Sequence, residues 1–215
     1  DEEKVKSTLN FINKLWNASR FCLMNIEGLK GYDFSDLDVQ DKWILSKLNK
    51  VISKVTKNME SYEFNNAGGE LYNFIWSDFC DSYIEMSKFS LDSVSTKSTL
   101  CYVISAILKM LHPFMPYVTD EIYNSLPVKD SKNIILSSYP KYNKDMIYKE
   151  DEKEIDILIE VISKLRNLKA DNNIPKGFGL INKFEEEYKD IIDKNAEILT
   201  RQLKCDIILS SFEGA

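Results

Sequence analysis

The side chains capable of chemistry are few and widely separated. His112 is the only histidine, and it stands directly before Pro113 at the end of a helical pattern, where capping is its usual role. The four cysteines lack the spacing of metal ligands: Cys22, Cys80, Cys101 and Cys205. One histidine cannot complete a metal site with them, and the chain offers no Ser/His or Cys/His pair for nucleophilic catalysis.

Phosphate-binding and carboxylate motifs are equally poor candidates for an active site. The segment 67–69 (Ala-Gly-Gly) has neither the spacing of a phosphate loop nor a strand before it. The acidic runs 150–154 and 185–187 have the character of solvated helix faces. We therefore predict that this chain, taken alone, has no active site and binds no cofactor or metal.

Bulk composition is that of a soluble globular protein with a sizeable core. The chain has 215 residues, is 44% hydrophobic and carries a net charge of −6. This charge excludes a broad electrostatic grip on nucleic acid, so any such role must rest on local contacts. Scattered cysteines in apolar settings predict reduced thiols and a cytoplasmic location, and no apolar run approaches the ~20 residues of a membrane span.

The segment 71–88 is the predicted centre of the fold. On an α-helix its apolar residues spread over more than half the circumference, which predicts the central and most buried helix of a bundle. Its narrow polar arc holds Asp81 and Lys88, with Cys80 and Ile84 at the margin. These two apolar residues are either the rim of another helix contact or part of a surface that meets a partner.

A second anomaly lies on the predicted first helix, residues 5–27. Its expected core face consists of Leu9, Ile12, Leu15, Trp16, Ser19, Leu23 and Ile26. Phe21 falls on the opposite, polar side, beside Asn17. A large aromatic side chain there either packs under a loop or is available to a partner.

The remaining pattern completes a mainly α fold. Further helices are predicted to end near Ser61, to end at His112 and to run from Tyr117 to Leu126, so that residues 1–127 form an antiparallel bundle. Residues 128–175 are expected to hold an extended tie or isolated strand at 133–136 and a long helix at 149–171 that packs on the bundle. Residues 176–215 are expected to form a small α/β unit, with strands at 178–181 and 206–209 around a helix at 185–202. The abrupt ends of the sequence suggest a fragment.

Several motifs, in order along almost the whole chain, resemble the anticodon-binding domain of valyl-tRNA synthetases. They are residues 13–21 (NKLWNASRF), 76–85 (WSDFCDSYIE), 112–116 (HPFMP) followed by 119–122 (TDEI), 166–169 (RNLK) and 174–175 (IP). Each motif alone is weak, and their combined order is specific. Ser82 departs from the pattern, since the family usually carries tryptophan there.

The resemblance implies a bundle of the class I synthetase type that binds the anticodon stem-loop of valine tRNA. In the family, the positions of Phe21, Cys80 and Ile84 contact bases, and these are the residues that the helical projections had set apart. Unstacked loop bases commonly rest on aromatic or apolar side chains, with polar neighbours at their edges. The nearby polar candidates are Asn17, Arg20, Asp81 and Lys88, although Arg20 and Asp81 could instead form a structural ion pair.

The resemblance also implies a parent enzyme that attaches valine to tRNA using ATP and Mg²⁺. Its catalytic domain would lie upstream of Asp1, its editing domain would also lie outside this chain, and the fragment itself would be monomeric and free of membranes. Two alternatives remain at this point: the same domain of an isoleucyl or leucyl synthetase, and a non-catalytic helical module that binds another protein.

Overall fold

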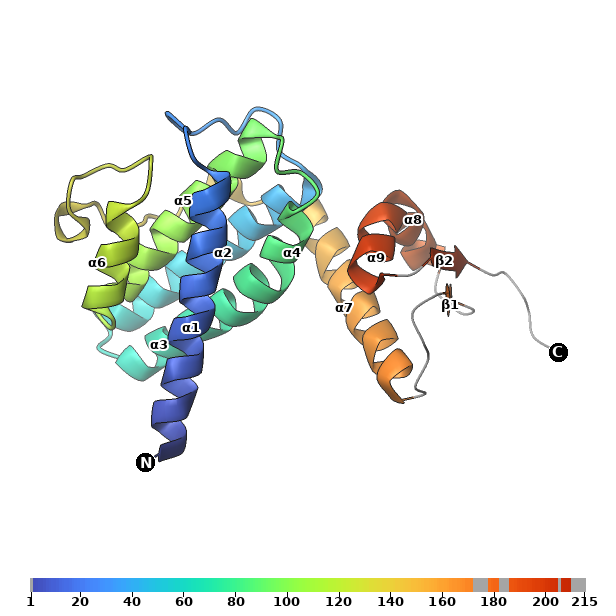
Figure 1. Ribbon diagram of the computed structural model, residues 1–215, viewed down its shortest axis with the longest axis horizontal. Coiled ribbons are helices and arrows are strands. Elements are labelled where there is room, and N and C mark those ends of the chain that lie inside the picture. Colours follow the sequence, from blue (N-terminus) through green and yellow to red (C-terminus); the bar gives the residue numbers. More distant parts are fainter. Residues whose placement is uncertain (1, 172–177, 182–185, 205, 210–215) are drawn as a thin grey trace. The chain divides into compact units, whose positions relative to one another are not determined.

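The computed structural model describes residues 2–171, 178–181, 186–204 and 206–209 (Figure 1). The chain divides into two compact units, Asp1–Lys149 and Glu150–Ala215. The sequence predicts three parts instead, with boundaries after residues 127 and 175. Those boundaries stay a prediction. The mainly α helical bundle is confirmed in the first unit.

In chain order, the first unit contains nine helical segments within its described residues. They are α1 (Glu2–Asn25), α2 (Val39–Glu60), α3 (Phe64–Asn73), η1 (Phe74–Tyr83), α4 (Ile84–Ser87), α5 (Val94–Leu111), α6 (Pro116–Asn124), η2 (Ile134–Leu136) and η3 (Lys144–Met146). Pro116 occupies the first turn of α6, where its missing N–H costs nothing. A strand at 133–136 is wrong, because residues 134–136 form the short 3₁₀ turn η2, while the alternative of an extended tie stays a prediction.

Helix α5 is the most buried helix of the unit, a place that the sequence had assigned to residues 71–88. Fourteen of the 18 residues of α5 are buried, and its small Ser, Thr and Ala side chains let neighbouring helices approach from several sides. It is the one described helix long and apolar enough to cross a membrane, and 78% of it is buried inside the protein. Its apolar character therefore belongs to a core helix.

The segment 71–88 is not one α-helix. Between α3 and α4 the backbone forms the π-helix η1, in which each N–H bonds to the carbonyl five residues earlier. Residues five apart therefore share a face, and Phe74 with Phe79, and Ile75 with Cys80, form buried pairs. A projection at the α-helical 100° per residue scatters these pairs, which is why it distributed the apolar residues around most of the helix.

The buried face of α1 also differs from the predicted one. The buried residues are Phe11, Leu15, Ala18, Ser19 and Cys22 of α1 and Ile26 directly after it. Of these, Leu15, Ser19 and Ile26 were predicted, and their burial is confirmed. Leu9 and Trp16, expected in the core, are 54% and 46% exposed. The buried face of α1 is rotated relative to the predicted one, because the small residues Ala18 and Cys22 allow α1 to approach the bundle closely. Leu9 and Trp16 lie outside that contact.

A buried carboxylate joins three of the helices. Asp41, in the first turn of α2, is fully buried and accepts hydrogen bonds from the Tyr83 hydroxyl (2.6 Å) and the Thr96 hydroxyl (2.8 Å). Burial raises the pKa of Asp41, against the lowering effect of these two hydrogen bonds. Burial and the neighbouring Asp41 also raise the pKa of Tyr83 well above its ordinary value. Asp41 thereby fixes the starts of α2 and α5 against the end of η1.

The second unit contains α7 (Lys149–Asp171), β1 (Phe178–Ile181), α8 (Glu186–Lys194), α9 (Ala196–Leu203) and β2 (Asp206–Leu209). The two strands pair in parallel, with Phe178 opposite Asp206. The single helix expected at 185–202 is wrong, because it is divided at Asn195, whose side-chain amide donates to Glu154 Oε1 (2.7 Å). The expected break at 172–177, Cys205 and the end of the chain at 210–215 lie outside the described residues.

We expect Asp41→Asn to change the pH dependence of stability. The folded-state pKa of Asp41 is raised above its unfolded value of about 3.9, so its contribution favours the fold below that pH and is lost as the pH rises through the folded pKa. Relative to Asp41→Asn, the unaltered protein should therefore lose unfolding free energy as the pH rises from about 4. The loss should approach about 1.4 kcal/mol for each pH unit that separates the folded-state pKa from the unfolded one.

Urea unfolding of both proteins between pH 4 and pH 8 measures this difference. Asp38, the nearest other carboxylate that acts on Asp41, is the same in both proteins and cancels in the comparison. A free-energy difference that stays constant with pH, or that moves in favour of the unaltered protein as the pH rises, would contradict the expectation.

Candidate functional site

Five of the seven residues predicted as a tRNA-binding site lie around one open hollow of about 450 Å³. Helix α1 supplies one wall, and η1, α4 and the residue after α4 supply the other. We call it the α1–α4 hollow, and it is lined by Lys14, Asn17, Ala18, Phe21, Cys80, Ile84, Glu85 and Lys88. The structure thus brings together Asn17, Phe21, Cys80, Ile84 and Lys88, which come from two regions about sixty residues apart in sequence.

The apolar side chains that line the hollow are mostly covered by the rest of the protein. Phe21 is half-buried, whereas Cys80 and Ile84 are only 8% and 6% exposed. Because α1 packs on η1, these two residues form the edge of a helix contact and also line the hollow. Of the two interpretations that the sequence left open for this pair, the rim of a helix contact is confirmed, and a surface that meets a partner stays a prediction.

Cys80 contributes to the hollow as a neutral thiol. Burial raises its pKa, the nearby Lys14 ammonium lowers it and Asp81 raises it, to a value of about 12. A thiol with this pKa is protonated at neutral pH and behaves as a small apolar group. Within the described residues, no cluster of three or more His, Cys, Asp or Glu side chains could hold a metal ion.

Charged side chains border the hollow, and two of them are lysines held by carboxylates. Lys88 Nζ lies 2.6 Å from Glu85 Oε1 and 5.8 Å from the centre of the Phe21 ring. Lys14 Nζ lies 2.6 Å from Asp81 Oδ1 and 3.7 Å from the centre of the Trp76 ring. An apolar floor bordered by lysines that are already paired with carboxylates suits a flat, uncharged group.

Two residues at this border, Lys14 and Glu85, were missed by the sequence analysis. Lys14 lay on the polar side of the predicted first helix, and without the partner helix nothing distinguished it from other surface lysines. The suggested ion pair between Arg20 and Asp81 is wrong, because the carboxylate of Asp81 pairs with Lys14.

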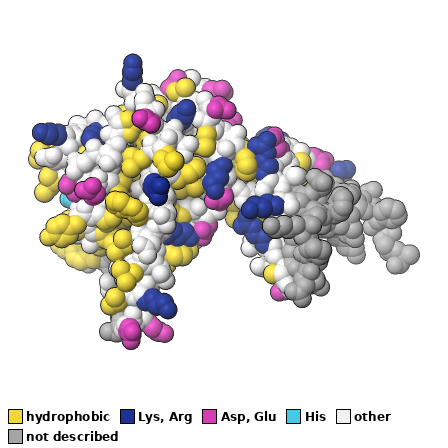
Figure 2. All heavy atoms as spheres, in the orientation of Figure 1, with side chains coloured by type: hydrophobic (Ala, Val, Ile, Leu, Met, Phe, Trp, Pro, Cys, Tyr) yellow, Lys and Arg dark blue, Asp and Glu magenta, His cyan; other side chains and the backbone are white. Residues whose placement is uncertain are grey.

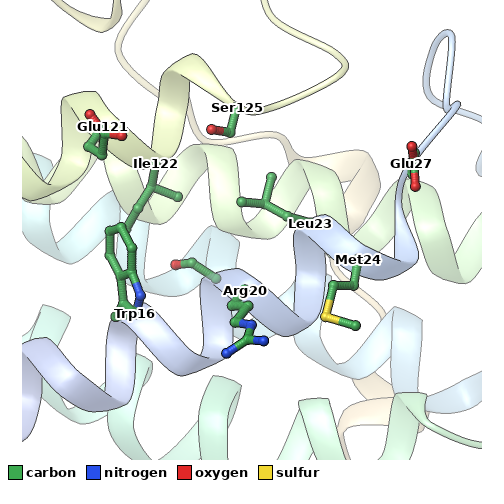
Figure 3. A pocket seen from close by; sticks show the side chains of 9 residues that line it. Trp16, Arg20, Leu23, Met24, Glu27, Glu121, Ile122 and Ser125 are labelled. Carbon is green, nitrogen blue, oxygen red and sulfur yellow. The ribbon is translucent and has the colours of Figure 1, made fainter.

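Arg20 lines a different hollow, which lies between α1 and α6 and has a volume of about 460 Å³. Figure 3 shows Trp16, Leu23 and Met24 of α1 on one side and Glu121 and Ile122 of α6 on the other. Exposed hydrophobic side chains also gather along α1 on the face drawn in Figure 2. Trp16 and Met24 are 46% and 70% exposed. The structure therefore separates Arg20 from the other predicted site residues.

Comparison with a family model agrees with the architecture and with the motifs. Residues 41–196 match the model described as the anticodon-binding domain of tRNA ligase. The matched range begins in the first turn of α2 and ends at the start of α9, so it includes the wall of the α1–α4 hollow that carries Cys80 and Ile84.

Curated relatives are valine–tRNA ligases of bacteria. The chain is 42% identical to the enzyme of Listeria innocua over 98% of this chain and 25% of the relative. It is 46% identical to the enzyme of Bacillus cereus over 80% of this chain and 20% of the relative. It is 41% identical to the enzyme of Oceanobacillus iheyensis over 93% of this chain and 24% of the relative. The chain thus spans a quarter or less of the length of these relatives.

We expect the alkylation of Cys80 by iodoacetamide to have an unusual pH profile. In the folded protein the rate should keep rising to pH 10, because the thiol pKa of about 12 keeps the reactive thiolate scarce. In urea the rate should level off above the ordinary cysteine pKa of about 8.5. Mass spectrometry of tryptic peptides measures Cys80 separately, and the fully buried Cys22 provides a slower reference. A plateau between pH 8 and 9 in the folded state would show that the thiol is not desolvated.

Proposed function

The chain belongs to the family of anticodon-binding domains of tRNA ligases, and from this premise we propose that it recognises the anticodon stem-loop of a valine-accepting tRNA. The relatives are named as valine–tRNA ligases, and the motifs that resemble this family occur in order along the chain. The parent enzyme would attach valine to that tRNA using ATP.

The observation that carries this proposal is the α1–α4 hollow. Phe21 offers part of an aromatic ring, Cys80 and Ile84 offer apolar surface, and all three line one cavity. Anticodon loops present bases that are unstacked and can rest on such side chains. An aromatic stacking site of this kind contributes about 1–3 kcal/mol per base.

The charges of the protein favour recognition of RNA by shape and base stacking. They disfavour recognition by attraction to the phosphate backbone. The net charge of the chain is −6, so the protein as a whole repels phosphate. The two lysines at the hollow are each paired with a carboxylate, which limits their attraction for a distant polyanion. Binding should therefore depend weakly on salt, since few counterions are released.

The remaining steps of the parent reaction are assigned to parts of a longer protein. We propose that catalytic and editing domains, with ATP and Mg²⁺, lie outside this chain, and that the enzyme works in the cytoplasm. The present chain would act as a monomeric binding module. The acidic run 150–154, expected from the sequence to be solvated, is partly covered, since Glu152 is buried and Glu154 contacts Lys194 and Asn195.

Replacement of Phe21 tests the proposal. Phe21→Ala should weaken binding of a valine anticodon stem-loop by about 1–3 kcal/mol, because it removes the ring on which a base would stack. The loss of stability should stay below the 3–5 kcal/mol typical of a phenylalanine removed from a core, because the ring is only half-buried. Affinity is measured at one fixed salt concentration, with an unrelated stem-loop for comparison.

Phe64→Ala is the matched control. Phe64 is 48% exposed at the start of α3 and does not line the α1–α4 hollow. Its replacement should leave stem-loop affinity unchanged. Phe21 is a better test position than Ile84, because a polar residue at the 6% exposed Ile84 would also disturb helix packing. Equal affinities for Phe21→Ala and the unaltered protein would remove Phe21 from the site.

A further inference from the structure

We propose that Trp76 and Asp81 are positioning residues that hold Lys14 of α1 between them. The π-helical register of η1 places both side chains against Lys14, and we call this contact the clamp. The clamp sets the spacing between the two walls of the α1–α4 hollow. The inference rests on the proposed function for its consequence in RNA binding. It assigns Asp81 a role within the protein, in place of the direct tRNA contact expected from the sequence.

The clamp is a contact of one ammonium group with two side chains of η1. Lys14 Nζ lies 3.7 Å from the centre of the Trp76 ring and 2.6 Å from Asp81 Oδ1. A cation above an indole face is the strongest of the cation–π arrangements. The side chain of Lys14 is only 23% exposed, whereas that of Asp81 is 56% exposed, so water competes mainly at the carboxylate.

The two partners of Lys14 share a face only because of the backbone. Trp76 and Asp81 are five residues apart, and in η1 the hydrogen bonds connect residues five apart. In an α-helix, neighbours on one face are three or four apart, and Trp76 and Asp81 would point in different directions. The register is further supported at this turn by Ser82, whose hydroxyl donates to the Ser77 carbonyl five residues earlier (3.0 Å).

A stack of aromatic rings extends the clamp along α1. The Trp76 ring stacks on Tyr72 at 5.6 Å, and Tyr72 stacks on Phe11 of α1 at 5.2 Å. Phe11 and Lys14 are three residues apart and lie on adjoining turns of α1. Helix α1 is thus held against α3 and η1 at two successive points, which fixes its rotation as well as its distance.

The rotation of α1 about its own axis determines which of its side chains face the hollow. Phe21 lies seven residues beyond Lys14, two turns along the same helix, and Cys80 lies one turn beyond Trp76 on η1. The clamp therefore sits at one end of the hollow and aligns its two walls. Because Asp81 neutralises Lys14, the lysine acts through position and adds little attraction for phosphate.

The first test uses the free protein and nuclear magnetic resonance. The ε-methylene protons of Lys14 should be shielded by the Trp76 ring, and Trp76→Leu should abolish that shielding. Lys14→Met should also shift the Phe21 ring and Ile84 methyl signals, because the walls move. Lys14→Arg retains the cation and should keep both signals near their original positions. Unshielded Lys14 protons, or Phe21 and Ile84 signals that are unchanged in Lys14→Met, would overturn the proposal.

The second test measures the Kd of a valine anticodon stem-loop as a function of salt. Lys14→Met and Asp81→Asn should each raise Kd by about two- to fivefold, the range expected for loss of one cation–π contact or ion pair. The double variant should be no weaker than Lys14→Met alone, since both changes break one clamp. The slope of log Kd against log salt should stay the same in all variants.

Lys54→Met is the matched control. Lys54 pairs with Glu70 (3.2 Å) between α2 and α3 and does not line the hollow, so its replacement removes an equal charge and should leave Kd unchanged. A fall of about 1 in the salt slope for Lys14→Met would show a direct phosphate contact and overturn the positioning role. Additive effects of Lys14→Met and Asp81→Asn would do the same. If Phe21→Ala weakens binding while the clamp variants do not, the proposed function stands and the clamp fails.

Discussion

The buried carboxylate of Asp41 is the constraint on which the arrangement of helices depends. Its two hydroxyl partners, Tyr83 and Thr96, belong to η1 and α5, and the carboxylate itself belongs to α2. An unsatisfied buried carboxylate is costly, so these three helices can pack only where both hydrogen bonds form. Tyr83 is the last residue of η1, and α4 continues directly from it. The position of Ile84 and of the wall that carries it therefore follows from a polar contact deep in the bundle.

The helical bundle was predictable because apolar periodicity, caps and prolines agree along most of the chain. The end of α2 at Ser61 and the end of α5 at His112 are examples. The π-helix was not predictable in this way, since a helical projection assumes its own pitch. With hindsight the sequence contains the signal: Phe74 and Phe79, and Ile75 and Cys80, repeat at intervals of five. An apolar pattern that surrounds an α-helix can thus indicate a change of pitch.

The candidate site was partly predictable because anomalies on two helices coincided with the family motifs. Phe21 on a polar face, and the apolar pair Cys80 and Ile84 beside polar residues, do meet in space. Lys14 could not be predicted, because its role depends on which face of α1 touches η1. That face was only partly predicted: apolar periodicity placed Trp16 in the core, whereas close packing selected the smaller Ala18 and Cys22. Side-chain volume decides such contacts, and apolar character alone does not.

The charges around the hollow have a consequence for selectivity. A domain that relied on free lysines would bind any RNA, since every RNA carries the same phosphates. Here the lysines on either side of the hollow are each paired with a carboxylate, and the whole chain is acidic. Under the proposed function, long-range attraction is thereby reduced, while the apolar surfaces of Phe21, Cys80 and Ile84 would still bind a base that fits between them. On that proposal, a stem-loop whose bases cannot enter the hollow would gain little from the protein, and discrimination would follow from weak general binding combined with one well-shaped contact.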